Sequence, residues 1–197
     1  EYSLYVPETY DADQQWPLIV CLHGGYGSGN DYIWSWLRIA RSRGYVLLSP
    51  KSYAQTWSIV QPPVDVNSIM AMIDDLVESH RIDRTRIFLS GLSDGGTFSY
   101  LLGLQHVDRF CAVAPIAGVL SPATDIMLRA GLAKDLPLHV VHGVHDMIFP
   151  VQTTRSTNQL FESLGYNLTY TELPDWGHAL TYAINEDIVL PWFEQIP

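Results

Sequence analysis

The chain has 197 residues, of which 47% are apolar and 16% are charged. Since a typical soluble domain has about 25% charged residues and disorder requires little apolar surface, this composition excludes an intrinsically disordered chain. The formal net charge of −10, from 11 Lys and Arg against 21 Asp and Glu, argues against nucleic acid or an anionic membrane surface as a partner.

Short apolar runs alternate with helical patterns along the whole chain. Runs too short for a helix predict strands at residues 3–6, 18–22, 45–48, 86–89, 111–116, 138–142 and 168–173. Amphipathic spacing and glycine stops predict helices at about residues 32–43, 65–80, 94–104, 151–164 and 179–195. This alternation predicts a single α/β domain over residues 1–197, with a mostly parallel twisted sheet and helices on both faces.

The cysteines and the apolar runs bear on the compartment. Cys21 and Cys111 each lie in an apolar run typical of a buried strand, which predicts two free thiols in a reducing compartment. The longest apolar runs fall far short of the roughly 20 residues of a membrane span, so no span is expected. We therefore expect a cytoplasmic protein. Because the chain opens at Glu1 without a methionine, secretion after removal of a leader, and a missing N-terminal strand, both stay open.

The most informative stretch is residues 86–96, where an apolar strand runs into Gly91-Leu92-Ser93-Asp94-Gly95 and then a helical pattern. A serine on a sharp strand-to-helix turn presses its neighbours against the adjacent backbone, where only glycine fits. The positive end of the following helix favours the negative charge that develops in acyl transfer. The pattern predicts that Ser93 is a nucleophile.

A serine hydroxyl needs a base to remove its proton, and the chain offers seven histidines. His178 follows a turn-rich loop, residues 174–177, directly after the last predicted strand. It is therefore expected at the carboxyl edge of the sheet, the edge that also carries Ser93. His23 ends a strand beside the glycine-rich loop 24–29, and we expect it to brace that loop.

The base in turn needs a carboxylate that holds its tautomer. Asp146 follows a predicted strand and precedes Pro150 and a helix, so it also emerges at the carboxyl edge. The order Ser, Asp, His along the chain is the one expected for this architecture. Asp125 and Asp135 are rival carboxylates, but no predicted strand precedes them.

Two other kinds of site fit less well. His139, His142 and His145 have a spacing that suggests zinc, but residues three apart on a strand point to opposite faces, so no metal site is expected. The glycine loop lacks the spacing of a dinucleotide site and the lysine of a phosphate loop, so no cofactor is expected. Instead, the N–H groups of Gly25 and Tyr26 are expected to join that of Asp94 in an oxyanion hole. One such donor is typically worth about 3 kcal/mol in the transition state.

Four segments, residues 22–25, 91–96, 142–150 and 177–178, together resemble the α/β-hydrolase superfamily. Within it, the chain is similar to the small phospholipase/carboxylesterase group and its polyhydroxybutyrate-depolymerase-like relatives, from about residue 18 to residue 192. The resemblance implies that Ser93 is the nucleophile, His178 the general base and then acid, and Asp146 its orienting partner. The chain departs from the family in being shorter at its N-terminus and in having no insertion long enough for a lid domain.

The lack of a lid favours small esters over long acyl chains. Tyr53, Trp57, Phe149 and Trp176 are expected to line the substrate pocket, with packing on the core as the alternative for each. The predicted function is a serine carboxylesterase that hydrolyses short-chain or small esters through an acyl-enzyme. An acyl-protein thioesterase, a serine peptidase and a non-catalytic ligand-binding hydrolase fold stay open as alternatives. The expected partner is a small-molecule ester, and no oligomeric state is predicted.

Overall fold

A computed structural model describes residues 1–60, 63–179 and 182–197, which contain one seven-stranded sheet. The strands follow the order β1-β3-β2-β4-β5-β6-β7 across the sheet. Only β1 runs antiparallel to its neighbour β3, and the other pairs are parallel. The strands span β1 Tyr2–Tyr5, β2 Trp16–Leu22, β3 Val46–Pro50, β4 Ile82–Leu92, β5 Ala112–Ile116, β6 Leu138–Gly143 and β7 Leu168–Leu173.

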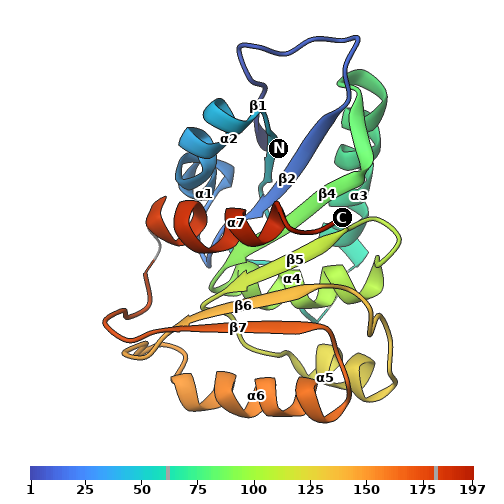
Figure 1. Cartoon of the computed structure of the whole chain (residues 1–197). Helices are drawn as coiled ribbons and strands as arrows, with labels where there is room; N and C mark the ends of the chain where they lie inside the picture. The colour runs from blue at the N-terminus through green and yellow to red at the C-terminus, as the bar shows by residue number, and fades with distance from the viewer. Residues whose placement is uncertain (61–62, 180–181) are drawn as a thin grey trace.

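Helices cover both faces of the sheet, as the sequence predicts. Figure 1 shows α7 crossing in front of the sheet and α4 behind it. The front face also carries α1 and α2, and the rear face carries α3, α5 and α6, as the two hydrophobic clusters show. The helical elements are α1 Gly29–Ile33, η1 Trp34–Trp36, α2 Leu37–Arg43, α3 Pro63–Ser79, α4 Asp94–Gln105, α5 Pro122–Arg129, α6 Val151–Ser163, η2 Ile184–Val189 and α7 Leu190–Phe193.

The central strands are buried on both sides, which explains why their sequences are continuously apolar. In β2, Leu18 and Val20 enter the cluster on the rear face, whereas Ile19 and Cys21 enter the cluster on the front face. All seven residues of β2 are buried. A strand covered on both faces has no solvent side, so it shows no polar alternation.

Several boundaries differ from the sequence prediction. Strand β4 begins four residues before the predicted position 86. The prediction missed this start because residues 83–85 are at least partly exposed and lack an apolar signal. The helix α5 was not predicted at all, although Ser121 caps it by accepting from the Thr124 N–H and Pro122 opens it. The predicted helix 179–195 is a π-helix followed by α7, and its residues 180–181 lie outside the described part of the chain.

Cys21 is buried and Cys111 is half-buried, each as a free thiol. Within the described residues, no helix combines the length and the hydropathy needed to cross a membrane. The same part of the chain contains no group of three or more His, Cys, Asp or Glu side chains placed to hold a metal ion.

Candidate active site

Ser93 lies at the apex of the turn between β4 and α4. Its backbone has φ 57° and ψ −118°, in the region that residues with a side chain rarely adopt. The turn is held by the Ser93 N–H, which donates to the Ile116 carbonyl at 2.9 Å at the end of β5. Such strain persists only where the surroundings impose it, and here it lifts the hydroxyl above the carboxyl edge of the sheet.

The glycines beside this turn are required by close backbone approach. A Cβ on Gly91 would overlap the carbonyl of Gly95, and a Cβ on Gly95 would overlap the carbonyls of Leu22 and His23. The turn therefore packs directly on the end of β2. This contact confirms the reason that the sequence suggested for the two glycines.

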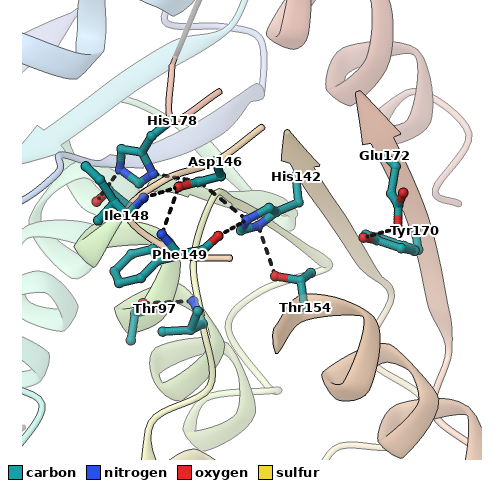
Figure 2. A network of polar contacts seen from close by, with 11 residues as sticks. Thr97, His142, Asp146, Ile148, Phe149, Thr154, Tyr170, Glu172 and His178 are labelled. Carbon is teal, nitrogen blue, oxygen red and sulfur yellow. Dashed lines mark hydrogen bonds and ion pairs between the residues drawn. The ribbon is translucent and has the colours of Figure 1, made fainter. Parts of the chain in front are cut away.

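The structure brings His178 and Asp146 to the same edge as Ser93. His178 Nε2 lies 2.9 Å from Ser93 Oγ. His178 Nδ1 lies 2.7 Å from Asp146 Oδ2, and Figure 2 shows these two side chains facing each other. Because the carboxylate only accepts, Nδ1 carries the proton and Nε2 is left to accept the serine hydroxyl. The three side chains come from the ends of β4, β6 and β7, and Ser93 and His178 are 85 residues apart.

Asp146 is buried and its oxygens are fully used. Its Oδ1 accepts the N–H groups of Ile148 at 2.9 Å and Phe149 at 2.8 Å, while Oδ2 accepts from His178. Burial alone would raise the pKa of Asp146, but the hydrogen bonds from Phe149, His178 and Ile148 outweigh burial and lower this pKa below its usual value. The carboxylate is therefore ionised and fixed in direction.

The loops that carry Asp146 and His178 are bound to each other by their backbones. The His145 N–H donates to the Trp176 carbonyl at 2.8 Å, and a Cβ on Gly143 would overlap that carbonyl and the carbonyl of Gly177. Hence the β6 and β7 loops cannot separate without breaking the histidine–carboxylate contact. The rival carboxylates lie elsewhere: Asp125 pairs with Arg129 on α5, and Asp135 is exposed.

The glycine loop approaches the nucleophile, as the oxyanion prediction requires. A Cβ on Gly24 would lie 3.5 Å from Ser93 Cβ, and a Cβ on Gly25 would lie 2.6 Å from Asp94 Oδ2. Asp94 is the first residue of α4, so its N–H has no acceptor within the helix. Within the described part of the chain, the N–H groups of Gly25 and Asp94 donate to no other backbone group.

Tyr26 does not fit the predicted oxyanion hole. Its N–H donates to the Gln55 carbonyl at 2.7 Å, so this donor is already used, and its side chain is 83% exposed. The prediction for Tyr26 is therefore corrected, because a contact between two loops consumes the N–H. The remaining candidate donors are those of Gly25 and Asp94.

Two buried groups brace this loop. The His23 ring is fully buried, accepts the Ser52 N–H at Nε2 over 3.1 Å and donates from Nδ1 to the Gly24 carbonyl at 2.6 Å, which confirms its predicted role. Burial lowers the pKa of His23 and so keeps the ring neutral. The Asp65 carboxylate accepts the N–H groups of Tyr53 and Ser58 and so fixes residues 53–58, the loop whose Gln55 carbonyl binds the Tyr26 N–H.

The four aromatic side chains that were predicted to line the substrate pocket differ in burial and contacts. Trp57 is 2% exposed, stacks on Phe98, packs against the tilted ring of His23 and donates to the His23 carbonyl. It therefore belongs to the core, and the pocket prediction is wrong for it. Trp176 is half-buried against the front-face cluster. The Phe149 ring contacts the His178 ring edge to face at 5.5 Å, and the Tyr53 side chain is 83% exposed.

The three histidines of the suspected zinc spacing lie apart. His139 faces Thr171 and Trp192 on the front face of the sheet, whereas His142 faces Thr154 on α6. His145 is exposed. From the sequence, His142 was assigned to no functional site; the structure buries its ring and places it against Asp146, with Nε2 3.4 Å from Oδ2.

Comparisons with known proteins bear on the family and the fold. The family model described as Phospholipase/Carboxylesterase matches residues 58–189. The bifunctional acetylxylan esterase/xylanase XynS20E of Neocallimastix patriciarum is 29% identical over 159 residues, which are 77% of this chain and 22% of that protein. The probable feruloyl esterase C of Aspergillus terreus is 28% identical over 159 residues, which are 77% of this chain and 56% of that protein.

The chain thus spans about a fifth and just over half of the lengths of these two curated relatives. Among solved structures, the fluorophosphonate-binding serine hydrolase FphF of Staphylococcus aureus matches 99% of this chain and 91% of its own, with a TM-score of 0.78 and 15% identity. Such a likeness shows the fold, and it confirms the α/β-hydrolase fold expected from the sequence.

Proposed function

The chain belongs to the phospholipase/carboxylesterase family, and from that membership we propose that it is a serine carboxylesterase that hydrolyses small carboxylic esters through an acyl-enzyme. The observation that carries the proposal is the imidazole of His178, which lies within hydrogen-bond distance of both the Ser93 hydroxyl and the Asp146 carboxylate. Nucleophile, base and orienting acid in this arrangement are the parts that acyl transfer needs.

Acylation begins when Ser93 Oγ attacks the ester carbonyl carbon and its proton passes to His178 Nε2. The negative oxygen of the tetrahedral intermediate is bound by the N–H groups of Gly25 and Asp94 at the positive end of α4. Asp146 stabilises the imidazolium that forms on His178. The intermediate collapses as His178 returns the proton to the leaving alkoxide, so that an alcohol departs and the acyl group stays on Ser93.

Deacylation repeats these steps with water. His178 removes a proton from a water molecule, whose oxygen attacks the acyl carbonyl. When the second intermediate collapses, the proton on His178 passes to Ser93 Oγ and the carboxylic acid leaves. The cycle consumes one ester and one water and restores the free enzyme.

The surroundings of the three side chains support a small or aromatic acyl group on an open surface. The exposed apolar side chains of Tyr26, Met147 and Ile148 adjoin Gly25 and Asp146 in the sequence, with exposed fractions of 83%, 94% and 62%. Exposed apolar side chains of this kind offer contact to an aromatic ring without enclosing it. The named activities of the two curated relatives, toward acetylated xylan and feruloyl esters, support the same range of acyl groups.

The test is a comparison of kcat/KM for p-nitrophenyl acetate, methyl ferulate and acetylated xylose, with a thioester and an amide of matched acyl length. We expect ester hydrolysis that falls by at least about 10⁴-fold in Ser93→Ala. Ser163→Ala is the matched control, because this exposed hydroxyl at the end of α6 donates to the Leu160 carbonyl within the same helix. Preference for the thioester or the amide, or turnover in Ser93→Ala within tenfold of the wild type, would overturn the proposal.

A further inference from the structure

His142 is a buried histidine beside Asp146, and the proposed mechanism gives it no role. It lies near the end of β6, and its side chain has no exposed surface. Its Nε2 is 2.8 Å from the Phe149 carbonyl and 3.4 Å from Asp146 Oδ2, while its Nδ1 is 3.0 Å from the Thr154 hydroxyl (Figure 2). Both ring nitrogens are thus engaged by the loop after β6 and by α6.

These contacts define the proton on the ring. Since a carbonyl oxygen only accepts, Nε2 must carry the hydrogen that binds Phe149 and points toward Asp146. Nδ1 then accepts the hydroxyl hydrogen of Thr154. A ring in this tautomer satisfies all of its partners, and the Phe149 carbonyl selects it.

The loop 146–149 is consequently held from two sides. Asp146 accepts the Phe149 N–H, and His142 binds the Phe149 carbonyl, so both peptide groups of this residue are fixed. The ring of Phe149 in turn packs edge to face on the ring of His178, with the two ring centroids 5.5 Å apart. A shift of the Phe149 backbone would therefore disturb the Asp146 carboxylate and the His178 imidazole together.

We infer that His142 is a positioning residue of this active site, which holds the 146–149 loop through its Nε2–H so that Asp146 faces His178 Nδ1. The inference rests on the proposed function only for its kinetic consequence. It assigns His142 no contact with substrate and no proton transfer. Its effect passes through Asp146 and Phe149 to His178.

Other charged groups near His142 come from each neighbouring element. Glu172 is its register partner on β7, and this carboxylate is held by Arg155 of α6 at 2.6 and 2.7 Å and by the Tyr170 hydroxyl at 2.8 Å. From the loops after β6 and β7 come Asp146 and His178. Because Arg155 neutralises Glu172, Asp146 is the carboxylate whose charge interacts most directly with His142.

The test compares His142→Leu with His142→Gln, whose amide N–H can replace the Nε2–H. His139→Leu is the matched control, since His139 is buried on the same strand but faces the other side of the sheet. We expect His142→Leu to lower kcat by about 10- to 100-fold with KM changed less than about threefold, since a small misplacement of a catalytic group has this effect. His142→Gln should recover most of that loss.

Two further readouts separate positioning from a loss of structure. In His142→Leu the acidic limb of the pH profile of kcat/KM should move to lower pH, because an imidazolium with a looser carboxylate partner loses its proton more readily. The low-field proton NMR signal of His178 Nδ1–H should weaken or move in His142→Leu, but persist in His142→Gln and His139→Leu. The NMR signal is independent of ester turnover, so it tests His142 even if the proposed function fails.

The inference is overturned if His142→Leu matches His139→Leu in kcat, pH profile and NMR signal, or if His142→Gln is as impaired as His142→Leu. Should His142→Leu not fold, Thr154→Val decides, because it removes the hydroxyl that binds His142 Nδ1 and so holds the ring in place. We then expect a smaller fall in kcat that Thr154→Ser reverses, and an unchanged kcat in Thr154→Val would contradict the inference.

Discussion

Replacing Asp146 by asparagine tests the orientation of the catalytic histidine most severely. The amide oxygen must occupy the place of Oδ1, because two backbone N–H groups, from Ile148 and Phe149, point at it. Turning the amide round would leave both of these buried donors unpaired, at about 1–3 kcal/mol each. The amide NH₂ group therefore faces His178 Nδ1, where the wild type has a carboxylate oxygen.

A donor at this position reverses the tautomer of the imidazole. Nδ1 must then accept, so Nε2 carries the proton and points it at Ser93 Oγ, where it cannot act as a base. A wrong tautomer of this kind costs about 10⁴-fold in kcat, or about 5.4 kcal/mol of transition-state stabilisation. The fold should persist, since the asparagine oxygen still accepts both backbone donors.

The assay is kcat/KM for p-nitrophenyl acetate, together with nitrogen NMR of the His178 ring. Asp125→Asn is the control, because this surface carboxylate pairs with Arg129 within α5, and it should change kcat/KM by less than about twofold. A loss below about 30-fold in Asp146→Asn, or an NMR spectrum that still shows a protonated Nδ1, would refute the reasoning.

Three further predictions concern the turn, the oxyanion region and the pH dependence of stability. Gly95→Ala forces a Cβ against the Leu22 carbonyl, so kcat/KM should fall at least about 100-fold and Tm by at least about 2 °C, and near-normal kinetics would show that the turn tolerates a side chain. Asp94→Asn keeps the bond from Thr56 but removes a negative charge beside the proposed oxyanion hole, so we expect kcat to rise about two- to tenfold, and a fall would contradict this placement. Burial lowers the pKa of His139 from 6.5 to about 4, so between these pH values the unfolded chain binds a proton that the folded chain does not, and stability should fall as pH falls. Urea unfolding at pH 7 and pH 4.5 should show a loss of up to about 3 kcal/mol that is smaller in His139→Leu, and equal losses would be evidence against this coupling.

The strongly patterned parts of the fold could be predicted from the sequence. Strands buried on both faces, such as β2, are short continuous apolar runs, and glycines at fixed positions around Ser93 mark a turn that no other residue could form. The helix α5 was missed because its signal is a capping serine followed by proline rather than an apolar stripe. Residues 83–85 at the start of β4 are at least partly exposed, so they carry no apolar signal either.

Details of the candidate site depended on contacts that a sequence does not contain. The Tyr26 N–H is consumed by Gln55, 29 residues further along, and only the packing of two loops reveals it. Trp57 could be assigned to a loop, but whether its ring faces the substrate or the core depends on the position of His23 and Phe98. The placement of His142 beside Asp146 likewise follows from how the loop folds back on β6.

The acyl-enzyme itself offers the sharpest test of the proposed chemistry. Intact-mass spectrometry of the chain quenched in acid during turnover of p-nitrophenyl acetate should show one added acetyl group, and peptide mapping should place it on Ser93. The adduct should be absent from Ser93→Ala and should build up when deacylation is slowed at low pH. Turnover that continues without any adduct, or an acetyl group that maps to another residue while Ser93→Ala remains active, would contradict the account.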